Sequence, residues 1–173
     1  HSAYQATLDW GLRMVLLVGF PAAIALCLLA GPILTTLFNY GQFNGLDVLM
    51  AQRSMWAFSF GVPAFMMVKV LASAFYARQN IKTPVKVAII ALIVNMLLNF
   101  SLIQPLQHAG LALSTTCAAL VNASILWWLL ARQSIFKAQA GWFGFLSKLC
   151  LANAMLAVFL WFGNDSTQTW LTW

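Results

Sequence analysis

Five long apolar segments, each nearly free of charged residues, constrain this sequence more than any other feature. They cover residues 10–38, 52–77, 84–103, 110–131 and 142–162. Each is long enough to cross a bilayer as a helix, which takes roughly 20 residues. In lipid every backbone polar group needs an internal partner, so a spanning segment is a helix or a strand of a closed barrel. The segments lack the alternating polarity of barrel strands. The sequence therefore predicts an all-α integral membrane protein with five transmembrane helices.

The composition supports the same class. Hydrophobic residues make up 62% of the chain and charged residues 7%, whereas soluble domains have roughly 45–50% apolar and about 25% charged residues. A soluble fold of this length has no interior large enough for so much apolar surface. The net charge is +6, but the basic residues lie mostly between the apolar segments or near their ends and form no stripe, so we expect no nucleic acid partner.

Helix boundaries can be read from a few residues. Asp9 is placed to cap the first segment, and Pro84 lies in the first turn of the third, where proline loses no hydrogen bond. The short turn at 104–109 makes the third and fourth segments antiparallel neighbours. Pro21 and Pro63 lie inside predicted helices and should kink them. Such kinks are either hinges of a transporter or prolines that a membrane helix tolerates.

The distribution of Lys and Arg predicts the orientation, because cytoplasmic connections of membrane proteins are enriched in these residues. One side of the membrane receives Arg13, Arg78, Lys82, Lys86, Arg132, Lys137 and Lys148, and the other receives only Arg53. We therefore expect a cytoplasmic N-terminus and an outward-facing tail after residue 162. The polar start at residues 1–9 lacks the features of a cleavable signal peptide, and we expect it to continue a longer protein. Tryptophans near the segment ends, Trp142 among them, are expected to anchor in the headgroup region.

Lys69 is the basic residue that lies deepest inside a predicted span. It precedes Arg78 by nine positions, which places it about 13 Å deeper along a helix. An ammonium at that depth costs a few kcal/mol and needs water or a partner. Ser73 and Tyr76 fall on the same helix face, so this face is predicted to line a polar cavity. The alternative is that the long Lys69 side chain extends back to the membrane surface.

Other polar residues in the spans carry two interpretations each. Arg53 either meets an anionic headgroup or phosphate, which makes it a further candidate residue of the substrate cavity, or is an interfacial arginine neutralised by Asp47 or lipid. Four further residues, Asn95, Asn99, Thr115 and Asn122, lie on facing surfaces of the third and fourth segments. They form an interhelical hydrogen-bond network or supply oxygen ligands to a small cation such as sodium. No carboxylate accompanies them, so hydrogen bonding between helices is the favoured interpretation.

The sequence offers no set of residues for covalent catalysis. Its acidic residues are Asp9, Asp47 and Asp165, which lie at helix ends or in loops, and its histidines are His1 and His108. These positions suit neither a carboxylate pair nor a Ser-His-Asp triad. Cys27, Cys117 and Cys150 lie inside apolar segments without metal-binding spacing, so buried thiols are expected. We predict no enzyme, no metal site and no cofactor.

Three stretches resemble one known family. They are LDWGLR at 8–13, LFNYGQF at 37–43 and FYARQNIKTPVK at 75–86. In these residues the chain is similar to the MurJ (MviN) family of lipid II flippases, which belongs to the multidrug/oligosaccharidyl-lipid/polysaccharide exporter superfamily. The resemblance covers nearly the whole chain and weakens after residue 162.

The resemblance implies a fourteen-helix transporter of two lobes in the bacterial inner membrane. Residues 1–131 would form part of the C-terminal lobe, matching family helices nine to twelve. Residues 132–173 would supply a cytoplasmic connection, an extra helix resembling the thirteenth, which borders the groove for the lipid tail, and a periplasmic tail. The expected partners are lipid II (the undecaprenyl-pyrophosphate-linked muropeptide), membrane lipids and the helices absent from this chain. Lys69 is the candidate cavity charge, because a basic group suits a pyrophosphate.

The resemblance implies transport of lipid II by alternating access, driven by differential binding together with membrane potential or an ion gradient. Sodium and protons are the candidate coupling ions. Two other functions remain open at this point. One is another exporter of the superfamily, either a polysaccharide-lipid flippase or a drug/cation antiporter, although an antiporter is expected to carry a carboxylate inside a span. The other is a non-transporting scaffold subunit, which has little reason to keep a charge as deep as Lys69.

Overall fold

The computed structural model describes residues 2–38, 45–106, 108–133 and 141–163, and nearly all of them are helical. The helices are α1 (Ser2–Leu28), α2 (Ala30–Phe38), α3 (Gly45–Tyr76), α4 (Lys82–Leu106), α5 (His108–Arg132) and α6 (Trp142–Gly163). Within these residues five helices, all except the short α2, are long and apolar enough to cross a membrane. The predicted all-α class with five spans is confirmed.

The first predicted segment, 10–38, is wrong as a single helix because the structure divides it at Leu29. Pro32 lies four residues after Leu28 and has no backbone N–H, so it cannot donate the bond that would carry α1 onward. A second helix, α2, starts at Ala30 instead. The helices continue through Pro21 and Pro63. Asp9 is not a cap, because α1 begins at Ser2 and Asp9 lies inside it.

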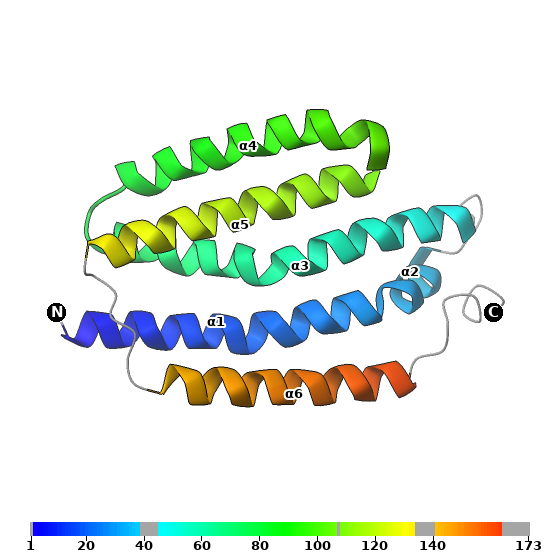
Figure 1. Ribbon diagram of the computed structural model, residues 1–173, viewed down its shortest axis with the longest axis horizontal. Helices are drawn as coiled ribbons and strands as arrows, with labels where there is room; N and C mark the ends of the chain where they lie inside the picture. The colour runs from blue at the N-terminus through cyan, green and yellow to red at the C-terminus, as the bar shows by residue number, and fades with distance from the viewer. Residues whose placement is uncertain (1, 39–44, 107, 134–140, 164–173) are drawn as a thin grey trace.

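The helices stand in a row, in the order α4, α5, α3, α1 and α6, as Figure 1 shows. The central helix α3 packs against α5 on one flank and α1 on the other, α4 packs on α5, and α6 packs on α1. One end of the row carries the exposed side chains of Arg78, Lys82, Lys86 and Arg132, and we call it the basic end. A buried cluster next to it joins α1, α3, α4 and α5. It consists of Leu8, Leu12, Leu71, Ala74, Phe75, Val87, Leu126 and Leu130.

Hydrogen bonds from side chains to backbone carbonyls join neighbouring helices of the row. Thr116 Oγ1 of α5 donates to the Ala57 carbonyl of α3 over 2.7 Å. Trp56 Nε1 of α3 donates to the Cys27 carbonyl of α1 over 2.9 Å. In a membrane such bonds, together with close backbone approach, replace the hydrophobic effect as the force between helices.

The connection between α3 and α4 ends one helix and starts the next within five residues. Gln79 has a positive φ of 57°. The Gln79 N–H bonds the Tyr76 carbonyl, and the Asn80 N–H bonds the Phe75 carbonyl. This is the Schellman pattern that closes a helix C-terminus. The Asn80 side chain then accepts bonds from the backbone N–H and hydroxyl of Thr83, which caps the start of α4.

Candidate functional site

Lys69, Ser73 and Tyr76 lie together on an exposed face of α3. All three side chains are exposed, while Leu71 and Phe75 on the other side of the same turns are fully buried. The Ser73 hydroxyl donates to the Val70 carbonyl of its own helix. No carboxylate of the described residues lies within ion-pair distance of Lys69. The structure thus brings the three predicted residues to one face, which we call the Lys69 face.

The Lys69 face continues along α3 to the end of the row opposite the basic end. At about 100° per residue, Asp47, Ser54 and Phe58 project in the same direction as Lys69. These three residues line a cavity of about 650 Å³ that α1, α2 and His108 help to enclose. One side of α3 is therefore polar near the basic end and opens into a hollow near the opposite end.

Arg53 does not join this face. Its side chain is exposed near the far end of α3, but the helical repeat places it on the side of α3 opposite Lys69. Arg53 is a candidate cavity residue from the sequence, and in the structure it projects from a different side of α3 than Lys69. The meeting of Arg53 with an anionic headgroup stays a prediction.

Two of the four predicted polar residues, Asn95 and Asn99, form a hydrogen-bonded network with a third residue, Ser114. Asn99 Nδ2 donates to Asn95 Oδ1 over 2.9 Å along α4, and the Ser114 hydroxyl of α5 donates to Asn99 Oδ1. Thr115 was expected in this role, but its hydroxyl donates to the Leu111 carbonyl of its own helix. The antiparallel packing of α4 and α5 presents Ser114 rather than its neighbour. This network joins α4 to α5, as expected of polar residues between membrane helices.

Asn122 stands apart from that network. It lies two turns further along α5, and its side-chain oxygen is buried without a hydrogen-bond partner among the described residues. The four residues Asn95, Asn99, Thr115 and Asn122 therefore do not converge on one point. A shared cation site made of all four has no support in this arrangement, and cation binding stays a prediction.

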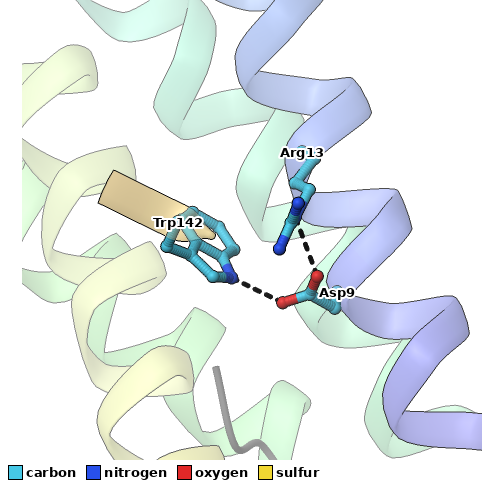
Figure 2. Close-up of polar contacts among 3 residues, drawn as sticks. All are labelled: Asp9, Arg13 and Trp142. Carbon is cyan, nitrogen blue, oxygen red and sulfur yellow. Dashed lines mark hydrogen bonds and ion pairs between the residues drawn. The ribbon is translucent and has the colours of Figure 1, made fainter. Parts of the chain in front are cut away.

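The structure also contains a polar cluster that the sequence did not reveal, at the junction of α1 and α6 (Figure 2). Asp9 is 2% exposed, and its Oδ1 accepts a hydrogen bond of 2.6 Å from Trp142 Nε1. Arg13 Nε lies 2.8 Å from Asp9 Oδ2. The Arg13 guanidinium carbon is 5.4 Å from the Trp142 ring and 5.7 Å from the Phe145 ring. The i, i+4 spacing of Asp9 and Arg13 signals their ion pair, but nothing in the sequence pairs them with Trp142.

An apolar groove of about 610 Å³ runs beside this junction. Its walls come from α1, α3, α5 and α6, and Trp142 belongs to them together with Leu12, Leu146 and Phe60. Phe60 projects from the side of α3 opposite Lys69. The groove and the Lys69 face therefore lie on opposite sides of the helix row.

Known proteins resemble this chain in sequence and in fold. The family described as "Lipid II flippase MurJ" matches residues 1–173. The lipid II flippase MurJ of Burkholderia cenocepacia is 42% identical over 154 residues, which are 89% of this chain and 30% of that protein. The probable lipid II flippase MurJ of Vibrio cholerae is 38% identical over 174 residues, covering 100% of this chain and 33% of that protein.

A solved structure agrees with the fold. The structure described as "Lipid II flippase MurJ, inward closed conformation" superposes with a TM-score of 0.82 over 98% of this chain and 35% of that chain, at 21% identity. The chain spans about a third of the length of these relatives. With a match along its whole length and five membrane-spanning helices, this chain is part of a multi-pass membrane protein and belongs to the MurJ family of lipid II flippases.

Proposed function

We propose that the full-length protein containing this chain carries lipid II across the bacterial inner membrane by alternating access, and that the Lys69 face lines its transport cavity. The observation that carries the proposal is a lysine with no ion-pair partner among the described residues, beside Ser73 and Tyr76 on one exposed face of a membrane-spanning helix. An ammonium in a span is stabilised by water or an anionic ligand rather than by acyl chains. The pyrophosphate of lipid II is an anionic ligand of this kind, and a lysine binds it as a point charge.

The same proposal assigns the two parts of the chain to different regions of the transporter. Residues 1–131 belong to the C-terminal lobe, and residues 132–173 contribute the helix that borders the lipid-tail groove. The exposed surface of α6 supports this role, because Met155, Phe159 and Phe162 lie along a shallow apolar hollow of about 750 Å³. Helices outside these 173 residues complete the cavity opposite Lys69. The basic end of the row faces the cytoplasm, in keeping with its exposed Arg and Lys side chains.

Complementation of cells depleted of their own lipid II flippase tests the proposal. The full-length gene is expressed as wild type, Lys69→Ala and Lys69→Arg, with Lys86→Ala as the control. Lys86 is also exposed, but it lies at the basic end on α4. We expect growth with wild type and Lys86→Ala, loss of growth with Lys69→Ala, and partial growth with Lys69→Arg, which keeps the charge.

Two results would contradict parts of the proposal. Lysis of cells that express and insert the wild-type protein would remove the lipid II function and favour another exporter of the superfamily. Full growth with Lys69→Ala would be compatible with lipid II transport but would show that transport does not need Lys69 in the cavity. That second result would mean that the lysine extends to the membrane surface.

A further inference from the structure

Helix α6 has a narrow attachment to the rest of the described chain. Among the described residues it packs against α1 and makes no comparable contact with α3, α4 or α5. Along this seam α6 presents Trp142, Phe145, Leu149 and Asn153, of which Leu149 and Asn153 are buried. The position of α6 is therefore set by its contacts with a single helix.

Most of these contacts are apolar, and apolar contacts alone do not fix how α6 is rotated or how high it stands against α1. Helix α6 is apolar nearly all around, and residues as large as Phe143 and Phe162 are more than four-fifths exposed on it. In lipid an apolar face gains little by choosing one apolar neighbour over another. A polar contact that lipid cannot replace is needed to fix the rotation and height of such a helix.

The junction of Asp9, Arg13 and Trp142 supplies that contact. A buried carboxylate is costly unless it is paired and hydrogen-bonded. Arg13 neutralises Asp9 from the same helix, and the Trp142 Nε1–H bonds the second carboxylate oxygen from α6. The same guanidinium lies against two aromatic rings of α6. Lipid acyl chains offer neither a donor for Asp9 nor an aromatic face for Arg13.

We propose that Asp9 and Arg13 form a docking site on α1 for Trp142, and that this site positions α6 as a wall of the apolar groove. Trp142 and Leu146 belong to that groove, so the docking of Trp142 sets how far α6 stands from α3 and α5. Asp9, Arg13 and Trp142 are positioning residues in this role. The proposal concerns the placement of α6 and does not depend on what the protein transports.

The chain contains a matched control for the junction. Trp128 lies beside Arg132, with the guanidinium carbon 5.2 Å from its ring. Both residues belong to α5 and lie near the same end of the row as Trp142. A change at Trp128 therefore removes a tryptophan that stacks on arginine without touching the seam between α1 and α6.

Spin-label distances in the full-length protein in lipid nanodiscs test the proposal. The native cysteines are replaced, and nitroxides are placed at the exposed positions Val18 of α1 and Phe159 of α6. A reference pair at Leu46 of α3 and Phe100 of α4, both exposed and outside the groove, monitors the rest of the row. Each pair is measured in wild type, Trp142→Ala, Trp142→Phe and Trp128→Ala.

We expect Trp142→Ala to broaden the distances between α1 and α6 and shift them to longer values, while the reference pair keeps its wild-type distribution. Trp142→Phe keeps a ring over Arg13 but loses the hydrogen bond, so its distribution should lie between wild type and Trp142→Ala. For Trp128→Ala we expect both label pairs to show the wild-type distance distributions. If Trp142→Ala fails to fold, Trp142→Phe and Asp9→Asn are compared with the wild type at the same positions.

Two outcomes would overturn the proposal. In the first, the distance between α1 and α6 stays as in wild type when Trp142 is changed, so apolar packing alone fixes α6. In the second, both label pairs broaden together, or Trp128→Ala has the same effect as Trp142→Ala. The cluster would then support general stability rather than the placement of α6.

Discussion

At the scale of single residues, Gly110 of α5 lies directly against the backbone of α4. A Cβ added at Gly110 would lie 2.8 Å from the carbonyl carbon of Leu102 on α4. Backbone atoms cannot rotate away as a flexible side chain can. We expect Gly110→Ala to push α4 and α5 apart and to lower the free energy of unfolding by about 1–3 kcal/mol, the usual cost of overpacking. Thermal unfolding of the purified protein measures the loss.

Gly144 provides the control for this prediction. It is an exposed helical glycine of α6, and a Cβ built there meets nothing within 4 Å. Gly144→Ala should leave the unfolding temperature unchanged or raise it slightly, because alanine favours a helix over glycine by roughly 1 kcal/mol. Equal losses for the two variants would show that the approach at Gly110 is not what limits stability.

A substitution at Asn99 can distinguish a role in hydrogen bonding between helices from a role in cation binding. Asn99→Leu removes the bonds to Asn95 and Ser114. For interhelical hydrogen bonds in membranes the average worth is about 0.6 kcal/mol. We therefore expect a small loss of thermal stability that is the same in sodium and in choline buffers. A loss that appears only in sodium would instead assign these oxygens to a sodium site.

The sequence identified several of these residues correctly and could not fix their partners. Asn95 and Asn99 share a face because their spacing matches the helical repeat. Whether Ser114 or Thr115 meets them depends on the relative rotation of α4 and α5, which packing sets. Asp9 looked like a helix cap because it precedes an apolar run, but its bond to Trp142 joins residues 133 positions apart. Local patterns carry no information about such a contact.

At the scale of elements, the turn between α3 and α4 contains a position where we expect a substitution to raise stability rather than lower it. Gln79 holds a left-handed backbone with φ of 57°, a conformation that glycine adopts without steric cost. Relief of the left-handed strain is worth about 1–2 kcal/mol, and the extra conformational entropy that glycine loses on folding costs roughly 0.5–1 kcal/mol. We therefore expect Gln79→Gly to raise the free energy of unfolding by a net amount of about 0.5–1 kcal/mol. A thermal shift assay on the purified protein measures the gain.

Arg78 is the control for this turn, since it precedes Gln79 and its φ is not positive. Arg78→Gly should therefore lower stability or leave it unchanged, and Gln79→Val should lower it because a β-branched residue is strained at positive φ. Stabilisation by Arg78→Gly as well would mean that general flexibility, not the backbone of Gln79, governs the turn.

Most element boundaries followed from the apolar runs, and the misses have physical causes. Helices α5 and α6 end within two residues of the predicted limits. Helix α3 begins at Gly45 rather than at residue 52, and Asp47 lies in its first turn, where the helix dipole favours an acidic side chain. The division between α1 and α2 was missed because the segment is continuously apolar and hides the effect of Pro32.

At the scale of the whole molecule, the row of helices predicts which ends face which compartment. We expect the basic end to be cytoplasmic. In a protein whose native cysteines are replaced, Leu46→Cys and Arg132→Cys each place one thiol at an exposed position, and the two positions lie at opposite ends of the helix row. A membrane-impermeant thiol reagent added to cells with a permeabilised outer membrane should label Leu46→Cys, and it should label Arg132→Cys only after lysis. The reverse pattern would invert the proposed orientation.

The arrangement of the row itself was beyond the sequence. Helical periodicity placed Lys69, Ser73 and Tyr76 on one face but left open whether that face meets a neighbour. In the structure α1 and α5 flank α3 and leave that face exposed. Because every helix is apolar around most of its surface, no single sequence pattern decides which neighbours it takes.

The pairing of α4 with α5 has a consequence for biosynthesis. A membrane protein is made from its N-terminus onward, so α4 leaves the ribosome before its partner α5. The bond between Asn95 and Asn99 lies within α4, so it needs no other helix to form and can shield part of both amides from lipid during that interval. Ser114 then completes the set once the next helix is made. The polar contacts of this hairpin can thus be completed in the order in which the chain is synthesised.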